Sequence, residues 1–432
     1  MTFTPPPAPG RPRPGRTLSL ALLVLVAPAL SGCDSLVGAG DPGPQPPTPI
    51  TELPRALSAA EVQVIQAGNS FGFDLLRRLA DEKPDRTVFV SPLSASMALG
   101  MALNGADGAT FDGMREALHL EGLDEEGINA GYRDLLDLLE GLDPEVELGV
   151  ANAVWHRTGI QVLDDYRTRV QDAFDARIEG LDFSDPGAAA RINGWVRDAT
   201  NGRIDEMVTP PIPGNMVAYL LNAVYFKGGW TEPFDPDLTR SARFRLADGN
   251  TAPIDLMMRD DTIRHRVAGN WAAADLPYAG GAFAMTVVVP AEGVSLDQLL
   301  NELTPEWWGE LVEGLGTSRA LVSLPRFELE WEGTLNDVLE GMGMAAAFDP
   351  GQANFSRMFQ GGGVWIDEVK QKSFLRVDEE GTEAAAATSV SMPSSMPPEI
   401  RADRPFLLAI RERLTGSILF VGAIREAPAP AS

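Results

Sequence analysis

The sequence predicts an α+β fold with mainly antiparallel β-sheets. Helical patterns dominate the first part of the chain and strand patterns dominate the later part, with no internal repeat and no regular strand–helix–strand alternation. The chain has 432 residues, of which 44% are hydrophobic and 22% charged, the balance of a folded globular protein. Disorder of the whole chain is therefore excluded.

Helix starts can be placed from their caps. Residues 58–61 read Ser-Ala-Ala-Glu, a capping box, and apolar residues from Val62 to Leu79 then fit one helix face. Ser91 followed by Pro92 places a cap residue before a proline at the first helical position, which predicts a helix that ends near Gly105.

Strands are predicted where apolar residues alternate or form short runs bounded by turn residues. The candidates are residues 146–154, 216–226, 284–289, 320–329 and 374–377, and a final hairpin of 406–410 and 418–424.

The charge balance narrows the classes of partner. The formal net charge is −26, which argues against binding to nucleic acid and to anionic lipid surfaces. Cys33 is the single cysteine, so no internal disulfide and no cysteine-based zinc site is possible. With three scattered histidines as well, we expect no metal and no cofactor.

The N-terminus predicts export. Three arginines precede a 13-residue apolar run at 18–30, which suits a signal-peptide core and is too short to span a bilayer. The run leads into Leu-Ser-Gly-Cys at 30–33, which resembles the lipobox of bacterial lipoproteins. This resemblance implies a signal peptide over 1–32, a lipidated Cys33 and an extracytoplasmic, membrane-anchored protein, on either the periplasmic face or the cell surface. The alternative is an ordinary signal peptide followed by a chance cysteine. The Pro- and Gly-rich residues 33–57 are expected to form a tether ahead of a domain at 58–428.

Three patterns suggest functions that their context argues against. Gly68 to Gly72 matches a G-x-S-x-G nucleophile pattern around Ser70, but it lies inside a predicted helix instead of a strand-to-helix turn. Residues 341–346 resemble a dinucleotide-binding loop, but a helix end followed by a turn is the better interpretation. The acidic residues of 121–140 are expected to form a solvated helix face.

The segment 379–399 carries the strongest functional signal. Composition alone favours a flexible surface loop, since the segment is rich in small residues and proline. Its period of two adds that Thr382, Ala384, Ala386, Thr388 and Val390 would share one face of a strand. All five are uncharged and small or β-branched, so the segment could enter a sheet with this face buried.

This segment resembles the hinge of a serpin reactive-centre loop, and the resemblance extends over nearly all of residues 58–428. Further matches in the family's order are the Ser-Pro-x-Ser helix start at 91–94, the Asn…Lys-Gly-x-Trp strand at 222–230, the Leu-Pro-basic strand at 324–326, and the C-terminal motifs at 402–406 and 418–422.

The resemblance implies a monomeric inhibitor of serine proteases that acts as a suicide substrate and is not an enzyme. The protease cuts the exposed loop, forms an acyl-enzyme, and is trapped when the loop inserts into the main sheet. The implied shutter residues are Ser91, Ser94, Asn222 and Gln371, and the implied breach residues are Trp230 and Arg326, with Arg326 paired to Glu379. The implied loop hinge consists of Glu379, Glu380, Gly381, Thr382, Glu383, Ala384, Ala385, Ala386, Ala387 and Thr388.

Two departures from the family pattern affect these implications. Gln371 stands where a shutter histidine is usual, so a pH-sensitive shutter is not expected. The loop is also about one residue shorter than in well-known members, which leaves the reactive bond open between Ser394-Ser395 and Ser395-Met396.

The loop composition predicts the class of target. No Lys or Arg occurs between Arg376 and Arg401, so trypsin-like enzymes have no bond to cut, and both candidate bonds present a serine. We therefore expect an elastase-like or subtilisin-like target. The alternatives are a non-inhibitory serpin that binds a ligand or serves as a substrate, and a serine hydrolase built on Ser70.

Overall fold

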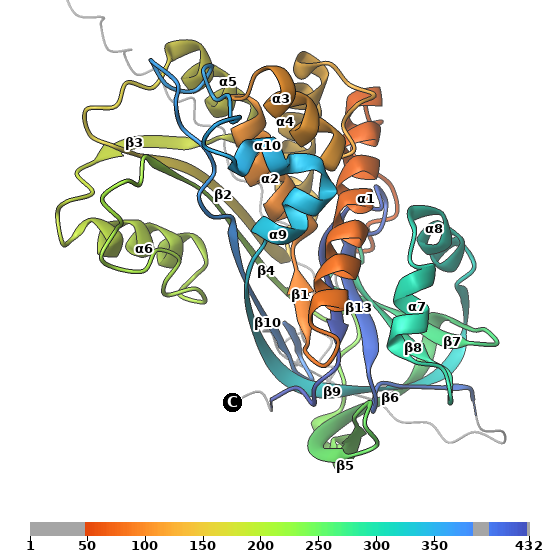
Figure 1. Cartoon of the computed structure of the whole chain (residues 1–432). Helices are drawn as coiled ribbons and strands as arrows, with labels where there is room; N and C mark the ends of the chain where they lie inside the picture. The colour runs from red at the N-terminus through yellow and green to blue at the C-terminus, as the bar shows by residue number, and fades with distance from the viewer. Residues whose placement is uncertain (1–47, 383–396, 430–432) are drawn as a thin grey trace, which may run out of the picture. The chain divides into compact units, whose positions relative to one another are not determined.

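The computed structural model describes residues 48–382 and 397–429, and it confirms the α+β fold with helices and largely antiparallel sheets (Figure 1). The described helices are α1 (Ala59–Glu82), α2 (Pro92–Leu103), α3 (Gly108–Ala117), α4 (Glu125–Gly141), α5 (Asp164–Phe174), α6 (Ala188–Ala199), η1 (Pro236–Leu238), α7 (Leu296–Glu302), α8 (Pro305–Glu313), α9 (Asn336–Leu339), η2 (Glu340–Met344) and α10 (Ala345–Phe348). The described strands are β1 (Val88–Val90), β2 (Val146–Arg157), β3 (Arg177–Leu181), β4 (Ala218–Gly229), β5 (Arg240–Arg245), β6 (Thr251–Val267), β7 (Trp271–Pro277), β8 (Phe283–Pro290), β9 (Gly316–Thr334), β10 (Lys370–Val377), β11 (Gly381–Thr382), β12 (Glu399–Arg401), β13 (Phe406–Glu412) and β14 (Ile418–Ile424).

The strands form two hydrogen-bonded sets. The larger set has the order β1-β14-β13-β8-β7-β6-β9-β10, with β5 paired to β6 and β12 paired to β9. The smaller set has the order β11-β4-β2-β3. Strands β6 and β9 are long and pair antiparallel from Asp255 opposite Arg326 to His265 opposite Gly316.

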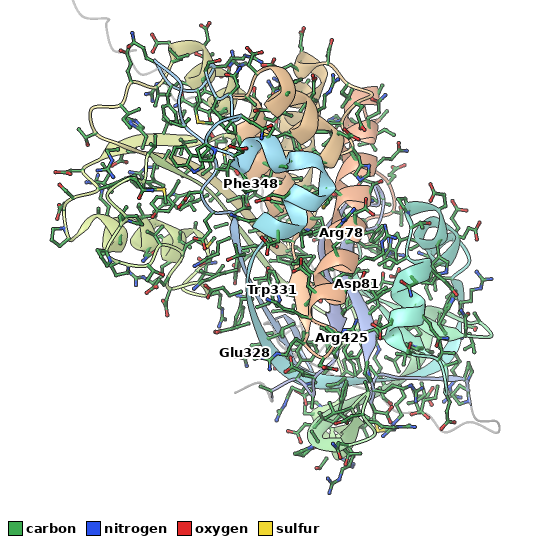
Figure 2. All side chains as sticks on the ribbon, in the orientation of Figure 1. Arg78, Asp81, Glu328, Trp331, Phe348 and Arg425 are labelled. Carbon is green, nitrogen blue, oxygen red and sulfur yellow. The ribbon has the colours of Figure 1, made fainter. Side chains whose placement is uncertain are left out.

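The main core lies around β8, β13 and β14, whose residues are all buried. Helix α1 packs against this region, and Phe89 of β1 stacks on Phe420 of β14 with ring centroids 5.5 Å apart. A second core cluster joins α6 to the face of β2 and β4 that carries Trp155 and Leu221. Exposed charges cover the outside, as Arg78 and Asp81 of α1 illustrate in Figure 2.

The predicted helix caps are confirmed. Ser58 and Glu61 form the capping box of α1, and the Ser91 hydroxyl accepts from the Ser94 amide at the start of α2. The prediction for Val62 is wrong, because its side chain is 37% exposed while Ile65 is buried. The predicted strands and the final hairpin are present, whereas β1, β3, β5, β6, β7 and β12 were not predicted.

Residues 48–57, which the sequence assigned to the tether, lie against the domain. The Ile50 amide donates to the Gly280 carbonyl at 2.8 Å, and Ile50 and Leu53 pack on the core. Arg55 donates to both oxygens of the buried Glu61. Residues 1–47, including the predicted signal peptide and Cys33, lie outside the described part of the chain.

The three misleading patterns have structural explanations. Ser70 lies within α1, and its hydroxyl donates to the Gln66 carbonyl at 2.9 Å, as an ordinary helical serine does. Residues 341–344 belong to η2, where Gly343 has φ +114°, so this segment is a helix that turns. In α4 the buried face is formed by apolar residues such as Leu135 and Leu139, and the acidic residues face outward or lie at its edges. Among the described helices, none is long and apolar enough to cross a membrane.

Candidate functional site: the β4–β10 slot and the loop hinge

The candidate site is a slot between β4 and β10, which belong to different hydrogen-bonded sets. Strand β4 pairs antiparallel with β2 along one edge, from Ala218 to Gly228, and β10 pairs antiparallel with β9 along one edge, from Lys370 to Val377. Between them lies a cavity of about 140 Å³ lined by β4, by α2 and by the segment 364–371. Within the described residues, no strand pairing joins β4 to β10, and the cavity lies beside the first residues of both strands.

Ser91, Ser94 and Gln371 meet at the floor of this slot. The Gln371 side-chain amide donates to the Ser91 carbonyl at 2.9 Å and its oxygen accepts from the Ser91 amide at 3.2 Å. The Ser91 hydroxyl donates to the Leu419 carbonyl at 2.6 Å and accepts from the Ser94 amide. Gln371 therefore joins β10 to the start of α2 with one donor and one acceptor, and neither changes charge with pH.

Asn222 takes part in a separate chain of hydrogen bonds that sequence reasoning missed. Asn152 of β2 donates to the Phe174 carbonyl at 2.7 Å, so its side-chain oxygen is the atom left to accept from Asn222, also at 2.7 Å. Asn222 is 5% exposed and lines the cavity, and its Oδ1 has no hydrogen-bond partner within the described residues. A buried acceptor of this kind favours an incoming donor.

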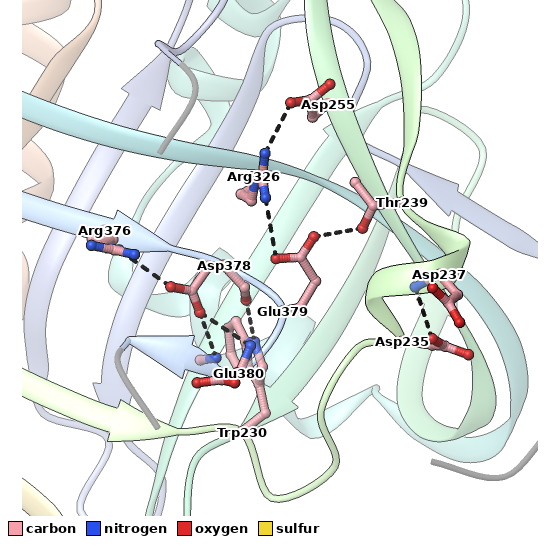
Figure 3. A network of polar contacts seen from close by, with 11 residues as sticks. Trp230, Asp235, Asp237, Thr239, Asp255, Arg326, Arg376, Asp378, Glu379 and Glu380 are labelled. Carbon is pink, nitrogen blue, oxygen red and sulfur yellow. Dashed lines mark hydrogen bonds and ion pairs between the residues drawn. The ribbon is translucent and has the colours of Figure 1, made fainter. Parts of the chain in front are cut away.

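Trp230 lies directly after β4 and holds the turn that follows β10. Its ring stacks on Tyr278 with centroids 4.5 Å apart, and its indole N–H donates to the Asp378 carbonyl at 3.0 Å. Its backbone amide donates to the Glu380 carbonyl at 2.9 Å. The C-terminal ends of β4 and β10 are therefore linked through one buried aromatic side chain (Figure 3).

Arg326 of β9 lies between two carboxylates (Figure 3). Its Nη2 is 3.1 Å from Asp255 Oδ2, and its Nη1 is 3.9 Å from Glu379 Oε2, so the contact implied by the sequence is present but is the longer one. Glu379 is 7% exposed and also accepts from the Thr239 hydroxyl at 2.6 Å. Asp255 and Thr239 were not singled out in the sequence, since nothing local marks them as partners.

The hinge begins as a short strand on β4. In β11, Gly381 lies opposite Gly229 and Thr382 opposite Gly228, antiparallel. Gly381 has φ +134°, and a Cβ there would lie 2.6 Å from Gly228 O and Trp230 N, so a side chain cannot be accommodated.

The rest of the predicted loop lies outside the described residues. This applies to Glu383, Ala384, Ala385, Ala386, Ala387 and Thr388, and to the reactive-bond candidates Ser394, Ser395 and Met396. The described chain resumes at Pro397 and forms β12, which pairs parallel with β9. The roles of these loop residues stay predictions.

Comparisons with known proteins agree with this architecture. Serpin B6 of Macaca fascicularis is 34% identical over 368 residues, which cover 83% of this chain and 97% of that protein. An uncharacterized serpin-like protein of Thermococcus kodakarensis is 35% identical over 385 residues, covering 87% of this chain and 88% of that protein.

Solved structures show the same likeness. The native state of the thermophilic serpin tengpin matches with a TM-score of 0.78 and 28% identity, over 88% of this chain and 97% of that one. Human thyroxine-binding globulin in complex with thyroxine matches with a TM-score of 0.79 and 27% identity, over 86% of this chain and 100% of that one. The family model for serpins, described as serine protease inhibitors, matches residues 66–427. The chain therefore belongs to the serpin family.

Proposed function

We propose that this protein inhibits a serine endopeptidase as a suicide substrate. The observation that carries the proposal is the slot between β4 and β10, which the hinge has already entered by one antiparallel step at Gly381 and Thr382. The protease serine hydroxyl attacks the scissile carbonyl, the peptide bond breaks, the new amino terminus leaves with a proton, and an ester joins loop to enzyme. Insertion of the freed loop then prevents hydrolysis of this ester.

The pairing of β11 defines which residues would meet on insertion. Continuing the antiparallel register from Gly381 opposite Gly229, each step along the loop moves one step back along β4 and places Thr388 opposite Asn222. On the other side, Asp378 and Gly381 exchange backbone hydrogen bonds at 3.0 and 3.3 Å, and the same count along β10 places Thr388 opposite Gln371. Both registers, counted from Gly381, would thus bring Thr388 between Asn222 and Gln371 in the inserted state.

This register explains the composition of the loop. Ala384 would lie between Phe226 and Leu375, which are both buried, so a large or charged residue there would meet the core. The Thr388 hydroxyl would reach the level of Asn222, whose Oδ1 needs a donor. Small residues on this face would fit against the core, and the Thr388 hydroxyl would supply the donor at Asn222.

The target that fits the loop is an elastase-like or subtilisin-like protease, which accepts a serine at the scissile bond. A lipid anchor at Cys33 would hold the inhibitor on an extracytoplasmic membrane surface, where it would meet secreted proteases. Both statements depend on residues outside the described part of the chain.

The test uses the mature chain with Cys33→Ser, incubated with elastase, subtilisin, chymotrypsin and trypsin at several stoichiometries. We expect a band at the summed mass that survives SDS with elastase or subtilisin. Sequencing of the released C-terminal peptide distinguishes Ser394-Ser395 from Ser395-Met396. Replacing the serine at the cut with arginine is expected to create trypsin inhibition, and the same replacement at the other serine is the matched control.

The second candidate is a non-inhibitory serpin that binds a ligand. It is favoured by the likeness to thyroxine-binding globulin, whose solved structure contains thyroxine. Cleavage of the loop without any SDS-stable band, for all four proteases, would select this candidate over the inhibitor.

A further inference from the structure

A cluster of basic side chains lies beside the slot, near the C-terminal ends of β4 and β10. Arg203, Lys227 and Arg376 line one small cavity together with Phe374 and Tyr225. They come from three separate elements: the segment after α6, the end of β4 and the end of β10. The Arg203 guanidinium lies over the Phe374 ring, 5.2 Å from its centroid, which places it above β10.

Neighbouring acids neutralise this cluster in part. Lys227 Nζ is 3.4 Å from Glu147 Oε1, and Arg376 Nε is 3.2 Å from Asp378 Oδ2. Glu147 is 59% exposed, so the first of these pairs is screened by solvent. The Lys227 and Arg376 side chains are themselves 29% and 27% exposed, so a further carboxylate can approach both.

The insertion register identifies that carboxylate. Two steps beyond Gly381, the count along β4 places Glu383 opposite Lys227. The count along β10 places Glu383 opposite Arg376. Residues directly opposite in a sheet point to the same face, so the Glu383 side chain would enter between the two cations on the side covered by Arg203. The alanines at 384–387 that follow Glu383 carry no charge and need no ionic partner.

We propose that Arg203, Lys227 and Arg376 form a docking socket for Glu383, which draws the hinge into the slot and stabilises the inserted loop. This inference rests on the proposed function and adds a specific electrostatic step to it. The socket would act at the start of insertion, because Glu383 is the first charged residue to enter. Faster entry favours trapping over hydrolysis of the acyl-enzyme.

The test compares Glu383→Gln and Glu383→Lys with Glu306→Gln, a matched control that removes the same charge from an exposed residue of α8, outside the hinge and the slot. We expect Glu383→Gln to raise the number of inhibitor molecules consumed per trapped protease roughly two- to five-fold, the range for a partly exposed ion pair. Glu383→Lys is expected to raise this number further, and Lys227→Glu combined with Glu383→Lys to restore it in part. Glu306→Gln is expected to leave the number unchanged, and about 1 M NaCl to reduce the difference between wild type and Glu383→Gln.

A second readout does not need protease trapping. The rise in melting temperature after loop cleavage measures stabilisation by the inserted strand, and this rise is expected to be smaller for Glu383→Gln than for Glu306→Gln. Equal effects of these two variants on both readouts would overturn the socket. If the wild type traps no protease, the proposed function fails, while the melting series still tests the socket.

Discussion

Strands β13 and β10 show two ways in which this chain uses a strand. Strand β13 pairs with β14 on one edge and β8 on the other, and all seven of its residues are buried. Within the described residues, strand β10 pairs with β9 on one edge, and its burial alternates along the whole strand. An unpaired edge is normally a liability that proteins cover or charge. Here that edge faces β4 across a cavity, which the cut loop would enter under the proposed function.

Cleavage of the loop is expected to remove the difference between β10 and β13, and this is the largest effect we expect. Cutting the loop between 389 and 396 is expected to complete the pairing of β10 and make it resemble β13. We expect the melting temperature to rise by about 10 °C or more, because several kcal/mol of new pairing and burial shift it by about 2 °C per kcal/mol. Differential scanning calorimetry of cut and uncut protein measures it, and an unchanged curve after a verified cut would contradict insertion.

The second prediction concerns a substitution that prevents the completion of β10 and leaves the described fold untouched. Ala386→Glu would place a carboxylate opposite Val224 and the buried Ser373, at a cost of several kcal/mol. We expect loss of the SDS-stable band, with normal cleavage and an unchanged melting temperature before the cut. Ala386→Ser is the matched control, since a small hydroxyl fits there, and equal trapping by both variants would refute the register.

A buried ion pair stabilises the region around β13, where both edges of the strand are already paired. In the sheet around β13, Arg411 lies 2.7 Å from Asp275, both are 1% exposed, and Asp275 also accepts from Thr286. Asp275→Asn leaves a buried guanidinium without its counter-charge and is expected to destabilise the fold by about 3 kcal/mol.

Because this pair joins β7 to β13 and takes no part in the β4–β10 slot, Asp275→Asn should lower the melting temperature of cut and uncut protein by similar amounts. Asp260→Asn, in the more exposed pair with Arg319, is the control with a small expected effect. A change confined to the cut form would show that the two regions are coupled.

The smallest expected effect is a pH dependence far from both strands. His119 Nε2 lies 2.9 Å from Asp74 Oδ2, and this hydrogen bond raises the pKa of His119 and lowers that of Asp74. The facing charges are Arg77, which pairs with Asp74, and Glu121. The stabilisation by charged His119 is fully present below its ordinary pKa and is lost as pH rises through its raised pKa.

Melting curves of wild type and His119→Gln should therefore differ most near pH ~6 and converge at higher pH. Burial lowers the pKa of His156, so His156→Gln is expected to show the opposite trend, with any gain in stability at low pH. Parallel curves for wild type and His119→Gln across roughly pH 5.5 to 8.5 would contradict the assignment.

Site residues could be predicted from the sequence where their partners are close in the chain, and could not where the partners are distant in the chain. Ser91 was recognised as a cap from its neighbours, and Gly381 as a hinge residue from the resemblance to the serpin loop. The φ of +134° and the close approach to Gly228 explain Gly381 fully only in three dimensions. The nearer partner of Arg326 is Asp255, 71 positions away in the chain, and no local pattern could select it over Glu379.

The sequence by itself determined the helix caps and seven of the fourteen described strands, including the final hairpin, because each of these is a periodicity or a short-range hydrogen bond. The tertiary structure decided which strand edges face each other, that Asn152 orients Asn222, and that Arg203 joins Lys227 and Arg376 at the slot. These features depend on residues that are distant in the chain and that only sheet pairing and helix packing bring together. The segment fitted for the slot is encoded locally, whereas the slot that would receive it exists only in the folded molecule.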